Sequence, residues 1–137
     1  MEWTRDDFVI TDDASRVDVD RTFDLLAETY WSVRRPRDVV VKMIENSLVF
    51  VLLHSNQQIG FGRAVTDYTV FSWIADIVID TWYRDRGLGK WMMTCIATHP
   101  AIKQTQMVLQ TRDAHSLYEQ FGFSKNAALM STEVKGL

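Results

Sequence analysis

The feature that most constrains this chain is a glycine turn placed between an apolar run and an amphipathic segment. Residues 74–79 are rich in β-branched side chains, which favours a buried strand. Residues 90–97 then carry apolar side chains at helical spacing. The stretch between them contains Gly87 and Gly89. A strand that turns sharply into a helix is therefore expected near the middle of a mixed α and β domain.

The same turn has the properties of an anion site. The first amide groups of a helix lack partners within it, and the helix dipole adds positive potential there. Gly87 and Gly89 allow close approach of a ligand because they carry no Cβ. Arg84, Arg86 and Lys90 supply positive charge. The turn predicts a phosphate or pyrophosphate site, although the chain lacks the dinucleotide-binding and P-loop glycine patterns.

A second motif follows about one helix and one strand later, as Leu117-Tyr118-x-x-x-Gly122-Phe123. Together with Arg84-x-x-Gly87-x-Gly89 it resembles the GNAT superfamily of N-acetyltransferases, and in particular its small bacterial members. The resemblance implies one N-acetyltransferase domain over residues 1–137. It also implies an α/β fold of the acyl-CoA N-acyltransferase type, with a central mixed sheet flanked by helices.

The resemblance further implies acetyl-CoA as cosubstrate. In the family the central strand separates from the strand after the helix, and the pantetheine arm of acetyl-CoA pairs with backbone in the gap. By motif position that backbone belongs to Ile77, Val78 and Ile79. The pyrophosphate is expected on the turn, whose binding residues would be Arg84, Asp85, Arg86, Gly87, Leu88, Gly89 and Lys90.

Two residues are candidates for proton transfer. Tyr118 would protonate the leaving thiolate of CoA, and its alternative role is to pack the helix on the sheet. Asp76 lies within the predicted central strand, where an unpaired carboxylate is unexpected. It would either take the proton of the acceptor amine or act as a structural carboxylate bonded to backbone or arginine. Both readings stay open at this point.

Trp31, Arg34 and Arg35 lie between the first two predicted helices, where the family forms part of its acceptor pocket. If these arginines line the pocket, a carboxylate on the acceptor follows, because arginine binds carboxylates bidentately. The expected reaction moves an acetyl group to a primary amine of a small molecule or peptide by direct attack in a ternary complex. The rival hypothesis is a non-catalytic module that binds acyl-CoA.

Composition narrows the class of protein. The chain of 137 residues is 47% hydrophobic and 24% charged, which is typical of one globular domain. Its net charge of −3 and lack of a basic run argue against nucleic-acid partners, including transfer RNA. Apolar runs are too short for a membrane span. The single cysteine, Cys95, fits a reducing cytoplasm, and the scattered histidines predict no metal. We expect a cytoplasmic monomer or homodimer.

Periodicity and turn residues predict the remaining elements. Asp18 is a candidate N-cap of the first helix, and Pro36 suits the first turn of the second. Residues 55–57 are expected to form a hairpin turn. The predicted strands are residues 8–11, 48–54, 58–65, 71–79, 107–111 and 129–134.

Overall fold

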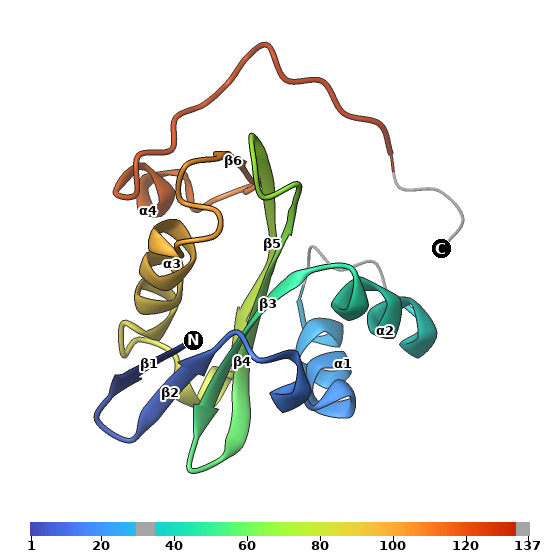
Figure 1. Cartoon of the computed structure of the whole chain (residues 1–137), viewed down its shortest axis with the longest axis vertical. Coiled ribbons are helices and arrows are strands. Elements are labelled where there is room, and N and C mark those ends of the chain that lie inside the picture. The colour runs from blue at the N-terminus through green and yellow to red at the C-terminus, as the bar shows by residue number, and fades with distance from the viewer. Residues whose placement is uncertain (30–34, 134–137) are drawn as a thin grey trace.

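The computed structural model describes residues 1–29 and 35–133 of the chain and contains one mixed sheet (Figure 1). Its six strands lie side by side in chain order. Neighbours are antiparallel except the last pair, which is parallel. The strands are β1 (Glu2–Arg5), β2 (Phe8–Thr11), β3 (Leu48–His54), β4 (Gln57–Thr66), β5 (Phe71–Ile79) and β6 (Gln106–Val108).

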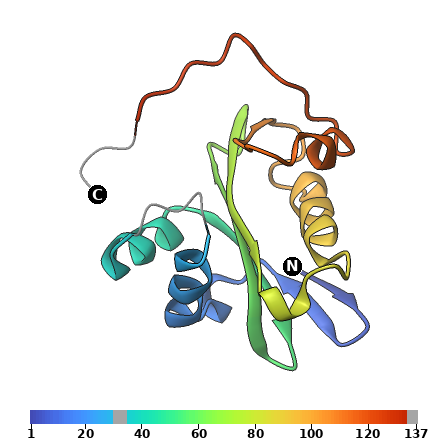
Figure 2. The same cartoon turned by 180° about the vertical axis from the view of Figure 1, so that it is seen from behind.

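Helices cover both faces of the sheet, as the two opposite views show (Figures 1 and 2). One face carries α1 (Val19–Ala27) and α2 (Arg37–Glu45), and the other carries α3 (Leu88–Thr98) and α4 (His115–Glu119). Two short 3-10 turns, η1 (Ala14–Arg16) and η2 (Thr81–Tyr83), lead into α1 and α3. No helix in the described ranges is long and apolar enough to cross a membrane. The mixed sheet with flanking helices confirms the predicted fold class.

Each face of the sheet has its own hydrophobic core, and β5 contributes to both. Met92 and Ile96 of α3 belong to the first core, against which Ile77 and Ile79 of β5 pack. Val78 belongs to the second core, under α1 and α2. Because helices cover both faces of β5, its sequence is a continuous apolar run and does not alternate between apolar and polar residues.

A β-bulge interrupts β5 at Asp76. Phe61 of β4 pairs with Val78 and Arg63 pairs with Ala75, so two residues of β5 oppose Gly62. Asp76 has a φ of 57°, in the left-handed region that non-glycine residues rarely adopt. A Cβ on Gly62 would lie only 3.0 Å from Sδ of Met92, so glycine opposite the bulge allows α3 to pack against the sheet.

Several local predictions are confirmed. The strand over residues 71–79 has the predicted bounds. Asp18 is the N-cap of α1, where its Oδ1 accepts a hydrogen bond of 3.0 Å from the amide of Arg21. Ser55 and Asn56 form the predicted hairpin turn, each with a positive φ.

Other predictions are wrong at both ends of the sheet. β1 was not predicted, and β6 covers residues 106–108 instead of 107–111. Residues 129–133, which were predicted to begin a last strand, are exposed and belong to no strand. This segment leaves the body of the molecule, so it lies beside no strand edge with which it can pair (Figure 1).

Candidate active site

The edge of β5 is open where the cofactor was expected. β5 pairs with β6 only through residues 71–73. Farther along, Val78 and Ile79 pair with β4 on one side. On the other side no strand in the described part of the chain pairs with Ile77, Val78 or Ile79. Free backbone donors and acceptors on such an edge can bind an extended ligand in the manner of an added strand.

The turn after β5 points amide groups at the same end of the sheet. Gly87 is the N-cap of α3, with a φ of 75° and no side-chain capping bond. The amide of Trp91 makes the first helical hydrogen bond, 3.0 Å from the carbonyl oxygen of Gly87. The amides of Leu88, Gly89 and Lys90 therefore have no acceptor within the helix. They stand at the positive end of its dipole, as an anion site requires.

Cationic side chains surround this turn. Arg84, Arg86 and Lys90 are exposed, and the guanidinium of Arg86 lies 5.3 Å from the ring centroid of Tyr83. Asp85 has a φ of 65° and helps to shape the turn. Unlike its neighbours Arg84 and Arg86, Asp85 carries a carboxylate and adds no positive charge to the turn.

Arg5 of β1 adds a cation that the sequence analysis missed. Its guanidinium lies 4.8 Å from the ring centroid of Trp91 on α3. Its Nη1 is 4.0 Å from where a Cβ on Gly87 would stand. No local pattern could have identified this residue, because its approach to the turn depends on β1 joining the sheet.

Asp76 lies in a buried ion-pair cluster on the face of the sheet that α1 and α2 cover. Its Oδ1 accepts a hydrogen bond of 2.9 Å from Nη1 of Arg35, and its Oδ2 accepts one of 2.6 Å from Nε of Arg63. The Asp76 side chain is only 1% exposed. Arg63 also donates to Oγ of Ser47 at 3.2 Å. Occupation of both carboxylate oxygens supports the structural reading of Asp76, and its role as a base stays a prediction.

Of the three predicted acceptor residues, Arg35 belongs to the described part of the chain. Its side chain is 18% exposed, so its guanidinium is partly accessible at the edge of the cluster. Trp31 and Arg34 lie outside the described residues.

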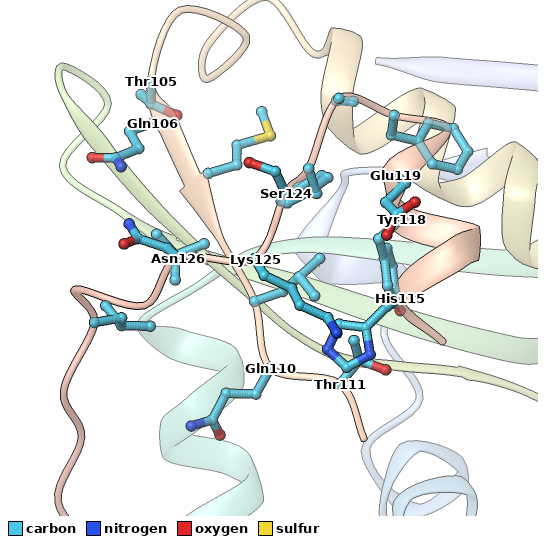
Figure 3. Close-up of a pocket in the computed structure, with 18 of the residues that line it drawn as sticks. Thr105, Gln106, Gln110, Thr111, His115, Tyr118, Glu119, Ser124, Lys125 and Asn126 are labelled. Atoms are coloured by element: carbon cyan, nitrogen blue, oxygen red, sulfur yellow. The ribbon is translucent and has the colours of Figure 1, made fainter. Parts of the chain in front are cut away.

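Tyr118 borders a hollow of about 1290 Å³ between β6, α4 and residues 121–129. Its ring meets that of Phe123 edge to face, with centroids 6.1 Å apart. In Figure 3, Tyr118 and His115 line the hollow from α4 and Gln106 lines it from β6. The glycine turn and Asp76 are not among its lining residues. The role of Tyr118 as an acid stays a prediction.

Metal ligands do not gather in the described part of the chain, where no group of three or more His, Cys, Asp or Glu side chains could hold an ion. Two of the three histidines bond to other side chains. His54 bonds to Tyr83 and Asp7, and His99 bonds to Asp12.

Comparison with known proteins assigns this architecture to a family. Residues 45–125 match the family model described as an acetyltransferase (GNAT) domain. A solved GNAT-family structure from Xanthomonas campestris pv. campestris, described as a candidate acetyltransferase, is 30% identical to this chain. The alignment covers 95% of each chain with a TM-score of 0.89.

Two more distant relatives also match, one by its solved structure and one by its sequence. A GNAT family acetyltransferase from Elizabethkingia anophelis, solved with acetyl-CoA bound, is 16% identical with a TM-score of 0.67. That alignment covers 88% of this chain and 78% of the other. A Gibberella zeae protein described as a candidate acetyltransferase is 23% identical over 113 residues, or 68% of this chain. The match spans 64% of the length of that relative.

The two readings of Asp76 predict different effects of Asp76→Asn. If the carboxylate is structural, the substitution removes one partner of two buried ion pairs and lowers the free energy of unfolding by about 3 kcal/mol. Urea unfolding measures this loss. Asp24→Asn, on an exposed residue of α1, is the matched control and should change stability by less than about 0.5 kcal/mol.

The activity of Asp76→Asn at different pH values distinguishes the two roles of Asp76 further. A structural carboxylate predicts a loss of activity that is uniform with pH. A base predicts a loss of activity that is large at pH 7 and smaller at pH 9, where more of the amine is already unprotonated.

Proposed function

Because this chain belongs to the GNAT acetyltransferase family, we propose that it transfers the acetyl group of acetyl-CoA to a primary amine. The observation that carries the proposal is the junction of β5 and α3. An open strand edge at residues 77–79 and a turn of unpaired amides at residues 87–90 lie at the same end of the sheet. Family membership alone supports acyl transfer in general, and the junction supports the choice of acyl donor.

The residues at this junction fit the chemistry of acetyl-CoA. Its pyrophosphate needs amide donors and cations. The first turn of α3 offers the amide donors. The cations are the side chains of Arg84, Arg86 and Lys90. Its pantetheine arm contains two amides, which can pair with an open strand edge. Acetyl-CoA supplies the acetyl group as a thioester.

The proposed reaction needs three contributions from the chain. A backbone amide on the open edge of β5, next to Val78, polarises the thioester carbonyl. The amine nitrogen then forms a bond to the carbonyl carbon as the carbon–sulfur bond breaks. Tyr118 gives its proton to the leaving thiolate, and the proton of the amine passes to water or to a side chain. No covalent acetyl-enzyme is required.

The cluster around Asp76 points to the kind of amine. Two guanidinium groups share one carboxylate, so these three groups keep one unbalanced positive charge. Arginine has five N–H donors, and within residues 1–29 and 35–133 Arg35 donates one hydrogen bond, to Asp76. Asp76 precedes Val78 by two residues, a distance of about 7 Å along a strand. We propose that Arg35 binds a carboxylate on the acceptor, a few bonds from its amine.

Gly89→Glu tests cofactor binding. Acetyl-CoA at a hundred times its dissociation constant should stabilise the wild-type chain by about 2.7 kcal/mol, seen as a raised melting temperature. Gly89→Glu should abolish that rise, because it places a carboxylate in the anion site. Thr94→Glu adds the same charge to an exposed position of α3 and should keep the rise. Undiminished binding by a folded Gly89→Glu protein would refute this site.

Tyr118→Phe tests the enzyme against the non-catalytic binding module. The ring and its packing on Phe123 remain, while the hydroxyl proton is lost. The kcat should fall about 10²-fold, with affinity for acetyl-CoA and melting temperature close to wild type. Tyr68→Phe, on an exposed tyrosine, is the control and should keep wild-type kcat. An unchanged kcat in Tyr118→Phe would return Tyr118 to a packing role, and absence of CoA release from the wild type with any amine would favour the binding module.

Arg35→Gln tests the acceptor class. Assays should compare amino acids with their amides, which keep the amine but lack the carboxylate. The KM for the amino acid should rise at least tenfold in Arg35→Gln, the usual order for a lost charge-assisted bond, while the KM for the amide changes little. Arg37→Gln, whose side chain is exposed, is the matched control. Equal use of amino acid and amide by the wild type would contradict this acceptor class and leave acetyl transfer standing.

A further inference from the structure

Four apolar side chains share the face of the sheet that carries α1 and α2. Val65 of β4 follows Arg63 by two residues, so it lies on the same face as that member of the ion-pair cluster. Trp73 of β5 is opposite Val65, and Val108 of β6 is opposite Trp73. Phe71 lies on this face too, because it precedes Trp73 by two residues. These four residues are here called the apolar patch.

The apolar patch belongs to neither hydrophobic core. Phe71 is 42% exposed and Val65 is 40% exposed. Trp73 and Val108 are half-buried, but in the described part of the chain neither of them packs against the core on either face of the sheet. Figures 1 and 2 show that the hairpin of β4 and β5 extends past α1 and α2. Apolar side chains that gather on an open part of a sheet face indicate a binding surface.

The apolar patch adjoins the ion-pair cluster of Asp76. Val65 is about 7 Å along β4 from Arg63, whose guanidinium belongs to that cluster. Along β5 the order is the backbone next to Val78, then the cluster with its unbalanced positive charge, then Trp73. An amino acid can reach all three places, because its amine, carboxylate and side chain are attached to one carbon. Its side chain must be large, since Trp73 precedes Asp76 by three residues, at most about 10 Å along a strand.

We propose that the apolar patch binds the side chain of the acceptor, which is therefore an amino acid with a large aliphatic or aromatic side chain. Trp73 lies between Val65 and Val108 and offers the largest apolar surface of the patch. A charged or strongly polar side chain would lose its hydration there without gaining a partner. This inference rests on the proposed function, because it extends the choice of acceptor that was made through Arg35.

Calorimetry on the wild type measures acceptor affinity without turnover when CoA, which carries no acetyl group, replaces acetyl-CoA. Leucine and phenylalanine should bind at least tenfold more tightly than glycine, because only they bury a large apolar side chain. They should also bind at least tenfold more tightly than asparagine, which is similar to leucine in size but polar. All four carry the same amine and carboxylate, so the difference in affinity reports the side chain alone. Equal affinities, or no binding of leucine and phenylalanine, would overturn the proposal.

Substitutions locate the preference on the apolar patch. Trp73→Ala should weaken phenylalanine binding at least tenfold and change glycine binding little, whereas Trp73→Phe, which keeps an aromatic ring, should retain most of the preference. Val65→Asp places a carboxylate on the patch at an exposed residue and should have the effect of Trp73→Ala. Val70→Asp adds the same charge to an exposed residue between β4 and β5 and is the matched control. Melting temperatures report folding, and a wild-type preference in folded Val65→Asp and Trp73→Ala variants would overturn the proposal.

Turnover separates this inference from the proposed function. With acetyl-CoA, the kcat/KM for leucine and phenylalanine should exceed that for glycine and asparagine at least tenfold. Equal kcat/KM for the four amino acids would overturn the role of the apolar patch and leave acetyl transfer standing. Absence of CoA release with any amine, together with tight leucine binding that Val65→Asp abolishes, would refute acetyl transfer and support the patch as a binding site.

Discussion

The ion pairs of Asp76 hold the bend on which the rest of this molecule depends. A left-handed backbone at a residue other than glycine costs about 1–3 kcal/mol, and surrounding contacts must fix it. Arg35 and Arg63 provide those contacts from the entry to α2 and from β4. The bulge that results lies between the part of β5 that pairs with β6 and the part whose edge is open. A bulge increases the local twist of its strand, so the bulge at Asp76 accompanies the separation of β5 from β6.

The two faces of β5 lead to two different regions of the proposed site. The face under α3 leads to the glycine turn and the amide groups that suit a phosphate. The opposite face, under α1 and α2, carries the cluster of Asp76, Arg35 and Arg63. In the proposed reaction, donor and acceptor recognition use different helices and different charges, and they share one strand. A chain of this architecture could then change its acceptor without disturbing the turn proposed to hold the donor.

The sequence was sufficient where structure is encoded locally. The β-branched run of β5, the Asp18 cap and the hairpin at Ser55 and Asn56 depend on neighbouring residues, and all three were predicted. The bulge could not be predicted, because it is defined by the register of β5 against β4. The position of Arg5 beside Gly87 depends on β1, a short strand with little apolar pattern. The failed strand after residue 128 shows that a strand-like segment still needs an edge to join.

The attachment of β6 has a consequence for folding. Three residue pairs, from Phe71 with Gln106 to Trp73 with Val108, join β6 to the sheet. These pairs join residues 35 apart in the chain, and only β2 and β3 pair across a longer separation, 40 residues from Thr11 to Val51; the other neighbouring strands are joined by short turns. Because only three residue pairs close this long loop, we expect the β5–β6 ladder to form slowly and to open easily. The β6 end of the molecule can therefore detach while the antiparallel part of the sheet stays folded.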